Sequence, residues 1–347
     1  MAKKAPTGPS GLIVVDKPAG LTSHDVVSKM RWIAGTRKVG HAGTLDPMAT
    51  GVLILGINKA TRLLTWVVGE TKTYTATIRL GVSTLTDDAD GEATAVSHDG
   101  ALDSISEDAI RQHIADLTGD IMQVPSAVSA IKVNGVRSYA RVRSGEEVDL
   151  EARPITVHSF DLHDARPATG TYQLGEEEVS TSVLDLDVTV VCSAGTYIRA
   201  LARDLGAALG TGAHLTALRR TAIGEIRAED AHALDELIAG REAEQVAPLL
   251  PIEEAARRLF AVRNLTAAEA TDLANGRRIT PTDGSPATTA PKTGSTGGHD
   301  KPTTTGLTAA FAPNGTLVAI IENTRFRREN VAAPVLVFEA GTTFKEN

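Results

Sequence analysis

Residues 40–53 read GHAGTLDPMATGVL and place a single carboxylate, Asp46, between a glycine-bearing turn and an apolar run. Glycine permits backbone conformations and close approaches that other residues resist, so this segment predicts a tight turn leading into a buried strand. Pro47 keeps Asp46 out of the α region and suits the first turn of a helix, so Asp46 could be a capping or turn residue. The glycines and the nearby His41 would equally suit a reactive carboxylate in a ligand-binding loop.

The composition limits the size of the domains and the class of protein to which the chain can belong. The 347 residues are 42% apolar but only 3% aromatic, so aliphatic side chains must build the core of a large domain and a small one. A lone Cys192 cannot form an intramolecular disulfide. The first ten residues are polar and no run approaches the roughly 18 apolar residues of a membrane span, so we expect a soluble, cytoplasmic protein.

Charge is unevenly distributed along the chain. The net charge of -8 argues at first against nucleic acid as a partner. Residues 1–62, however, contain nine Lys or Arg and three Asp, a net of +6, and residues 193–227 contain five Arg against two acids, a net of +3. Acidic residues concentrate elsewhere, as at residues 87–90, 146–151 and 176–178. One positive face is enough for phosphate contacts, and the alternative is that these charges are solvated surface.

Five further motifs accompany the Asp46 segment. They are VVDKPAGLTS at residues 14–23, KTY at 72–74, QVPS at 123–126 with AIK at 130–132 and SYAR at 138–141, CSAGTYIR at 192–199, and HLTALRR at 214–220. Together with residues 40–53 they resemble the motifs of the TruB-type tRNA pseudouridine synthases, in that family's order, over about residues 11–227.

The resemblance implies an α+β fold, in which a mixed, largely antiparallel sheet is flanked by helices. Residues 11–250 would form the catalytic domain, with residues 82–150 as an insertion that grips RNA. Residues 251–347 are similar to a small PUA-like β-barrel, an RNA-binding domain of many RNA-modifying enzymes. Residues 281–306, rich in Pro, Thr, Gly and Ser, cannot bury enough apolar surface to fold and are expected to be disordered, as are residues 1–10.

Local patterns predict the main elements. Alternation and apolar runs predict strands at residues 11–15, 52–56, 74–80 and 184–191, with further strands within 307–322 and 332–339. Helical spacing predicts a helix after a Ser23 cap, another at residues 197–209 after a Thr196 cap, and helices at residues 106–117, 230–238, 253–259 and 265–274.

Arg199 is oddly placed for a surface cation. It falls in the first turn of the helix predicted at residues 197–209, where the helix dipole disfavours positive charge. Holding a carboxylate or a phosphate would account for its position. Cys192, just before this turn, could suggest a cysteine nucleophile, but no local base supports that, so we interpret it as a small buried hydrophobe.

The resemblance also implies roles for individual side chains. Tyr74 would stack on the target base, and His41 would help to fill or stabilise the RNA loop that the base leaves. Tyr197 and Leu218 would line the pocket. Candidates for RNA backbone contacts or for bracing the site are Lys17, Lys132, Arg141, Arg219 and Arg220.

The implied reaction is the isomerisation of uridine to pseudouridine at position 55 in the T arm of tRNA, after the base has been flipped out of the RNA. Asp46 would be the nucleophile, on the base or on the ribose, and Arg199 would favour its charged form and position it. The reaction needs neither redox change nor energy input, so no cofactor and no metal are expected. tRNA would be the partner of a monomeric enzyme that has no obligatory protein partner.

Two other classes remain open. One is an enzyme acting on nucleosides or glycosides with Asp46 in a carboxylate pair, which needs a second placed acid that the motifs do not nominate. The other is a non-catalytic RNA-binding protein or tRNA-folding chaperone on the same fold. Substitution of Asp46 separates the last class from an enzyme, because RNA binding should survive while modification is lost.

Overall fold

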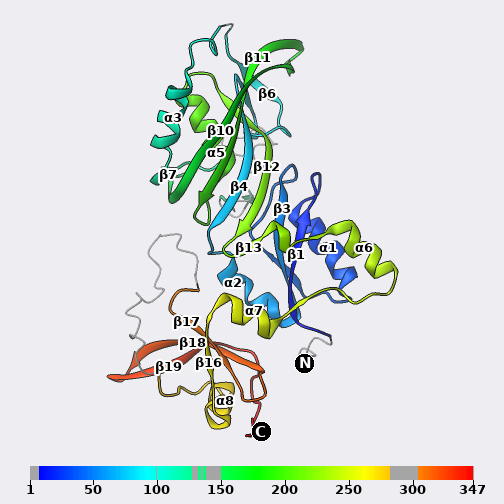
Figure 1. Ribbon diagram of the computed structural model, residues 1–347, viewed down its shortest axis with the longest axis vertical. Coiled ribbons are helices and arrows are strands. Elements are labelled where there is room, and N and C mark those ends of the chain that lie inside the picture. Colours follow the sequence, from blue (N-terminus) through cyan, green and yellow to red (C-terminus); the bar gives the residue numbers. More distant parts are fainter. Residues whose placement is uncertain are drawn as a thin grey trace.

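The computed structural model describes residues 8–98, 100–126, 150–281 and 304–346, together with the backbone at residues 132–133 and 136–137. Figure 1 shows a long central sheet with helices at its sides and a smaller sheet at its lower end. Both chain ends lie toward this lower end (Figure 1). No helix in the described part of the chain is long and apolar enough to cross a membrane.

Eleven strands of the described residues form the central sheet. They are β1 (Gly11–Lys17), β2 (Val39–Ala42), β3 (Thr50–Ile57), β4 (Lys72–Leu80), β7 (Gly119–Gln123), β10 (Arg153–Leu174), β11 (Glu177–Cys192), β12 (Ala213–Ile223), β13 (Ile226–Arg227), β14 (His232–Ala233) and β15 (Leu250–Pro251). The main order is β14, β1, β3, β12, β4, β11, β10, β7. Only the β1–β14 and β3–β12 pairs of this sheet are parallel. The predicted mixed, largely antiparallel sheet is confirmed.

Helices cover the two halves of this sheet separately. The α-helices of the described chain are α1 (Ser23–Ile33), α2 (Leu64–Val67), α3 (Glu107–Asp116), α5 (Ile198–Ala208), α6 (Leu234–Glu242), α7 (Ile252–Leu259) and α8 (Ala267–Ala274), and the short 3-10 helices are η1 (Asn58–Arg62) and η2 (Ala228–Asp230). Side chains of α1 and α6 pack with β1 and β3 in one core, whereas α3 and α5 pack with β4, β10, β11 and β12 in another (Figure 1). The halves meet where β3 and β12 pair over only two residues, Thr50 and Gly51 on the β3 side.

Both caps assigned from the sequence are wrong by one residue. The cap of α1 is Thr22, whose hydroxyl accepts from the Asp25 N–H while the Asp25 carboxylate accepts from the Thr22 N–H. Ser23 is instead buried inside the first turn. Tyr197, not Thr196, stands at the cap position of α5, and no side chain caps that helix. Where two adjacent polar residues could both occupy the cap position of a helix, the direction in which the chain enters the helix decides which of them does.

The long hairpin of β10 and β11 extends far beyond the strand predicted at residues 184–191. Residues 184–192 of β11 pair with β4, and residues 153–157 of β10 pair with β7. Residues 168–174 and 177–183 form a two-stranded ribbon that continues past the sheet (Figure 1). In this ribbon exposed side chains alternate with half-buried ones, and Thr181 and Val183 are buried, so one face is covered only in part.

The described part of residues 82–150 contains a small hairpin of β5 (Val82–Thr84) and β6 (Ala93–Val96), followed by α3 and β7. Ile110 and Ile114 of α3 are buried in the core that α5 forms with β4, β10, β11 and β12, so this part is integral to the sheet's packing. The backbone of β8 (Lys132–Val133) pairs with that of β9 (Val136–Arg137). The grip on RNA assigned to this region stays a prediction.

The C-terminal sheet contains β16 (Ala261–Asn264), β17 (Leu307–Phe311), β18 (Leu317–Phe326) and β19 (Glu329–Val337), in that order. β16 and β17 are parallel and the other pairs antiparallel. Within the described residues β16 does not pair with β19, so the closed barrel expected of a PUA-like domain is not confirmed. Residues 1–7 and 282–303, which make up most of the predicted disordered segments, lie outside the described residues.

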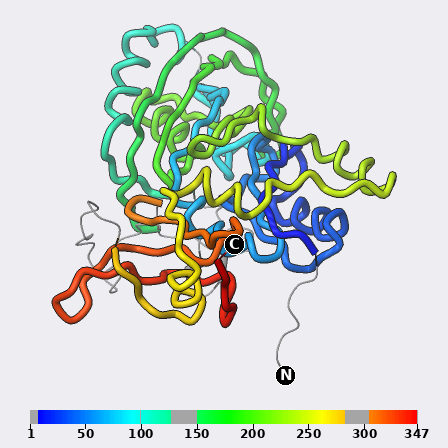
Figure 2. The backbone as a smooth tube through the Cα atoms, turned by 60° about the horizontal axis from the view of Figure 1, so that its bottom comes forward, coloured from blue at the N-terminus to red at the C-terminus, as the bar shows by residue number. Residues whose placement is uncertain are grey.

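The C-terminal sheet shares a core with one half of the central sheet. Side chains of β1, β3, α2, α7, β17 and β18 form one buried apolar cluster. The rings of Trp66 in α2 and Phe260 after α7 meet edge to face, with their centroids 5.4 Å apart. In Figure 2 the yellow segment that contains α7 runs between the blue N-terminal part and the orange strands. The division into domains between residues 250 and 251 therefore stays a prediction.

Candidate active site

Asp46 lies on the loop between β2 and β3, at the junction of the two halves of the central sheet. Gly43 in this loop and Gly51, the second residue of β3, have a left-handed backbone, with φ of +78° and +98°. A Cβ on Gly51 would lie 2.2 Å from the carbonyl oxygen of Arg220, a separation that real atoms do not adopt. The start of β3, directly after the loop, therefore packs against the β12 backbone in a way that only glycine permits.

Two buried polar side chains hold the loop from the β1–α1 side. The Ser23 hydroxyl accepts from the Leu45 N–H at 2.8 Å and donates to the Leu45 carbonyl at 3.1 Å. The ammonium of Lys17, which is fully buried, donates at 2.9, 2.6 and 3.1 Å to three carbonyls, those of Pro18, Leu21 and Pro47. Burial lowers the pKa of Lys17 from its ordinary 10.5 to about 8, and the charge of nearby Asp46 opposes this shift.

One of two adjacent arginines of β12 holds the loop from the opposite side. Arg220 is buried and donates to the carbonyls of Val52 at 2.8 Å and Gly43 at 2.9 Å. Arg219 instead forms a two-point ion pair with Asp16 at 2.9 and 2.7 Å, and its side chain is 39% exposed. Because Arg220, like Lys17, does not reach the surface, its geometry favours bracing the loop over contacting RNA.

Arg199 binds both carboxylate oxygens of Asp46, with Nε 2.9 Å from Oδ2 and Nη2 3.2 Å from Oδ1. A third nitrogen, Nη1, donates to the Thr86 carbonyl at 2.6 Å. The side chain of Arg199 is 5% exposed and that of Asp46 is 36% exposed. The carboxylate is thus oriented from its buried side and accessible on the other. A carboxylate partner also explains an arginine in the first turn of α5.

Asp88 is a site residue that the sequence did not reveal. Its Oδ2 lies 3.5 Å from Nε of Arg199, so this guanidinium contacts two carboxylates. The Asp88 side chain is 5% exposed, and burial raises its pKa, while the Thr86 hydroxyl and Arg199 oppose the shift. Residues 87–90 looked like acidic surface because a run of aspartates at a turn carries no local signal of burial.

A second group of contacts ties the end of β7 to α5. The side-chain amide of Gln123 accepts from the Tyr197 N–H at 2.9 Å and donates to the Tyr197 carbonyl at 3.1 Å. The Ser126 hydroxyl donates to the carboxylate of Asp87, and Nη1 of Arg203 lies 3.7 Å from the same carboxylate. The QVPS motif thereby supports the helix that carries Arg199.

Tyr74 and Leu218 lie beside the loop, and their roles in stacking on the base and lining its pocket stay predictions. Both are buried in the same apolar cluster as Leu45, and Tyr74 lies directly opposite Arg220 across the β4–β12 pairing. Burial raises the pKa of Tyr74, so its phenol stays protonated. Burial and the charge of Arg220 lower the pKa of His41, which is therefore neutral at pH 7. In the described chain the buried Nδ1 of His41 has no hydrogen-bond partner.

Two predicted RNA contacts cannot be placed. Arg141 lies outside the described residues, and Lys132 is described only as backbone of β8. Cys192 is buried in the catalytic core, and burial raises its pKa to about 11. A thiol in this environment is protonated at neutral pH, which supports its interpretation as a small buried hydrophobe.

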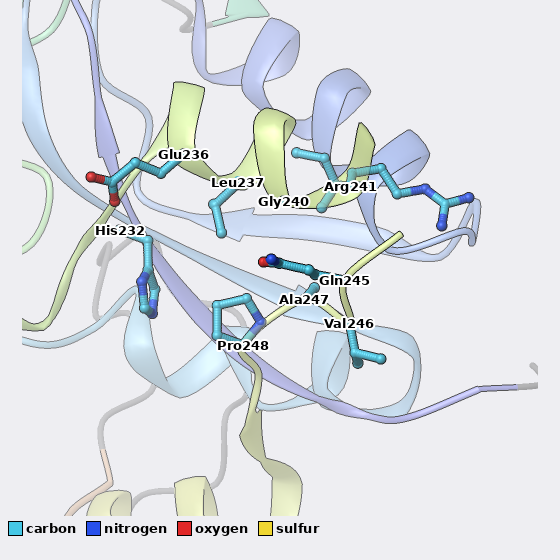
Figure 3. Close-up of a pocket in the computed structure, with 10 residues that line it drawn as sticks. His232, Glu236, Leu237, Gly240, Arg241, Gln245, Val246, Ala247 and Pro248 are labelled. Carbon is cyan, nitrogen blue, oxygen red and sulfur yellow. The ribbon is translucent and has the colours of Figure 1, made fainter. Parts of the chain in front are cut away.

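A pocket of about 130 Å³ lies elsewhere, against α6. Figure 3 shows His232, Glu236, Arg241 and Gln245 around the helix and the chain that follows it. None of the side chains that surround Asp46 lines this pocket. Among the described residues, no three His, Cys, Asp or Glu side chains are grouped so as to hold a metal ion.

Solved structures with similar architecture identify the class of fold. A chain of an H/ACA RNP bound to a substrate RNA containing 2'-deoxyuridine superposes with a TM-score of 0.61, at 22% identity, over 97% of this chain and 87% of that one. A chain of the archaeal box H/ACA sRNP Nop10-Cbf5 complex gives a TM-score of 0.60, also at 22% identity, over 97% and 88%. At this identity the likeness concerns the fold alone.

Sequence comparison identifies the family. Residues 31–198 match the model of the TruB family pseudouridylate synthase N terminal domain, and residues 199–257 match the tRNA pseudouridylate synthase B C-terminal domain. Proteins named tRNA pseudouridine synthase B are 56% identical in Arthrobacter sp. (strain FB24), over 95% of this chain and 96% of that protein, and 48% identical in Streptomyces coelicolor, over 94% and 97%. The chain belongs to the TruB family of pseudouridylate synthases, and the prediction of an enzyme is confirmed.

Proposed function

We propose that this protein converts uridine 55 in the T arm of tRNA to pseudouridine, with Asp46 as its essential carboxylate and without a cofactor. The observation that carries the proposal is the two-point pairing of Asp46 with a buried Arg199 that leaves the carboxylate 36% exposed. The names of the relatives in Arthrobacter and Streptomyces support tRNA as the substrate.

The proposed reaction is an isomerisation within one nucleotide. The bond between C1' of the ribose and N1 of uracil breaks, the uracil rotates, and C1' bonds to C5. N1 takes up a proton and C5 releases one to solvent, so atoms and electrons balance. An oxygen of Asp46 bonds transiently to C6 of the base or to C1' of the ribose and is then displaced. Either route needs an ionised carboxylate, a form that the adjacent guanidinium of Arg199 favours.

The main contribution to catalysis that we assign to the protein is to hold the Arg199 guanidinium in position before the substrate binds. Asp88 and the Thr86 carbonyl hold Arg199 from its buried side, so the guanidinium needs no rearrangement when substrate arrives. A flipped uracil would then lie against Tyr74 and Leu218, with Tyr197 at the edge of the pocket. His41, neutral at pH 7, would help to fill or stabilise the RNA loop that the base has left.

The alternative of a nucleoside or glycoside hydrolase with a carboxylate pair is less well supported. Such enzymes need two carboxylates that both reach the substrate. Asp88 supplies a second acid near Asp46, but its side chain is 5% exposed and contacts Arg199. Only Asp46 of these two is open to a ligand, which favours a mechanism with one nucleophilic carboxylate.

The proposal is tested with an unmodified tRNA transcript whose uracils carry tritium at C5. Isomerisation through C5 must release the label from the modified position to water. We expect about one equivalent of tritium per tRNA from the wild type and none from Asp46→Asn, whose affinity for the same tRNA should be retained. A transcript with cytidine at position 55 is the control for the site. Tight binding with no release by the wild type would overturn the proposal and leave a binding protein or another RNA substrate.

We further propose that the enzyme acts in the cytoplasm as a monomer and needs no protein partner. The tritium assay with purified protein tests the last point directly, since full activity without additions contradicts an obligatory partner. Light scattering on the active fraction gives the oligomeric state.

A further inference from the structure

The hairpin between β18 and β19 ends in four consecutive exposed residues, Arg325, Phe326, Arg327 and Arg328. The hairpin projects sideways from the C-terminal sheet in both views (Figure 1, Figure 2). Within the described part of the chain, none of these three arginines forms an ion pair, and Glu329 is the acid that directly follows them. A protein of net charge -8 thus carries an unneutralised basic cluster at the end of a protruding hairpin.

The backbone of this turn is unfavourable for the residues that occupy it. Arg327 and Arg328 have φ of +48° and +74°. A two-residue hairpin turn with both φ values positive prefers Asn-Gly, because side chains with a Cβ resist the left-handed region. Two arginines are therefore kept at a position where local stability favours other residues. Strain of this kind supports a functional role when the side chains themselves could act.

A further arginine from outside the hairpin joins the cluster. The guanidinium carbon of Arg278 lies 3.7 Å from the centroid of the Phe326 ring, and that of Arg327 lies 5.3 Å from it. The backbone of Ile279 bridges to Ala332 of β19, which places Arg278 beside the hairpin. Arg278 forms no ion pair among the described residues, whereas its neighbour Arg277 pairs with Asp272. Stacking on an aromatic face orients a guanidinium and leaves its N–H groups free to donate outward.

We propose that this arginine tip, defined as Arg278, Arg325, Phe326, Arg327 and Arg328, binds phosphates of the tRNA outside the T stem-loop. The inference rests on the proposed function. Two guanidiniums, those of Arg278 and Arg327, lie over the Phe326 ring, and Arg325 and Arg328 add two more exposed charges beside it. This set matches the phosphodiester backbone, which is recognised by charge and by N–H donors rather than by sequence. Side chains of the C-terminal sheet share a core with β1, β3, α2 and α7, so this sheet is packed against the part of the chain that carries the Asp46 loop.

The turn itself provides a variant that removes charge without harming the fold. Arg327→Asn combined with Arg328→Gly installs the dipeptide that this turn type prefers, so stability should be retained or increased. We expect the affinity for full-length tRNA to fall about tenfold near 0.1 M salt, and the slope of log affinity against log salt to weaken by about 1 to 2. Affinity for an isolated T stem-loop, and tritium release from it, should be unchanged.

Two comparisons make the result decisive. The double variant Arg241→Gln and Arg258→Gln removes the same formal charge from exposed positions on α6 and α7 and should change affinity for full-length tRNA less than twofold. Arg278→Gln should reproduce part of the loss seen with the turn variant. Equal losses on the stem-loop and on full-length tRNA, or no loss on either, would overturn the proposal. Binding of the wild type, but not the turn variant, to vesicles with 30% anionic lipid, together with unchanged tRNA affinity, would assign the tip to a membrane surface instead.

Failure of the proposed function gives a different pattern. A wild type that releases no tritium from the stem-loop contradicts the reaction, whatever the turn variant does. The contribution of the arginine tip is measured as a change in tRNA affinity, and this measurement does not require the enzyme to convert its substrate.

Discussion

Arg199 and Asp46 are 153 positions apart in the chain, yet the guanidinium of one binds both carboxylate oxygens of the other, at 2.9 and 3.2 Å. Arg199 is anchored in α5 and its third nitrogen is bonded to the Thr86 carbonyl, so it cannot turn away from the carboxylate. Asp46 in turn is carried by a loop that four buried polar side chains hold, those of Ser23, Lys17, Arg199 and Arg220. The orientation of the carboxylate is therefore set by groups from both halves of the sheet.

Arg199→Lys should show that geometry matters beyond charge. Lysine keeps the positive charge but cannot bind two carboxylate oxygens and the Thr86 carbonyl at once. We expect the single-turnover rate of pseudouridine formation to fall by about 100-fold, because a misplaced nucleophile loses its near-attack position. Affinity for tRNA, measured in parallel, should change less than about threefold. A variant with nearly full activity would mean that only the charge is needed.

Asp88→Asn tests the buried carboxylate beside Arg199. The amide keeps the shape of the side chain but removes the charge that holds the guanidinium, so we expect a rate loss of about ten- to 100-fold with unchanged tRNA affinity. Asp90→Asn is the matched control, because that residue is exposed and lies two positions further on. Equal rates for the two variants would remove Asp88 from the site.

Gly51→Ala should destabilise the whole protein. The new Cβ would lie 2.2 Å from the Arg220 carbonyl oxygen at a φ of +98°, so we expect a loss of about 2 to 4 kcal/mol in the free energy of unfolding. Gly20→Ala shares a positive φ, +82°, but its Cβ would have no heavy atom within 4 Å, so it should cost only about 1 kcal/mol. Urea denaturation of the two variants measures the difference. Similar losses would mean that the close approach at Gly51 relaxes freely.

Lys17 should make stability depend on pH in the alkaline range. Its pKa is about 8 in the folded protein and 10.5 ordinarily, so between these values the unfolded chain binds more protons than the folded one. The free energy of unfolding should therefore rise with pH from about 8 to about 10.5, by at most about 3 kcal/mol. Lys17→Met removes this contribution. Denaturation of both proteins at pH 7, 8, 9 and 10 gives the difference, and parallel curves would show that Lys17 titrates normally.

Phe260→Ala tests whether the C-terminal sheet is a separate domain. The ring contacts Trp66 and belongs to the core that both parts share, so its loss should cost about 3 to 5 kcal/mol. Because that core is common, we expect Trp66 fluorescence and circular dichroism to report one coincident transition in the wild type. Two separated transitions would establish independent domains.

The elements near the site were predictable to different extents. Strands with one buried face, such as β4, follow from alternation in the sequence, because side chains at every second position meet the same core. The β10–β11 ribbon was missed, because beyond the sheet only one of its faces is covered, and that only in part. The caps at Thr22 and Tyr197 depend on how the chain enters each helix, which adjacent serine and threonine residues do not reveal.

The sequence by itself determined the Asp46 loop, the family and the need of Arg199 for an anionic partner, because these depend on glycines, a proline and a helix position that are read locally. Only the tertiary structure decided that Lys17 and Arg220 serve the loop from inside, and that Asp88 contacts Arg199. The physical reason is that burial and hydrogen-bond partners arise between segments far apart in the chain. The local sequence around an aspartate in a surface turn can match that around an aspartate beside a buried arginine. The two differ in the residues that the fold brings next to them from distant parts of the chain.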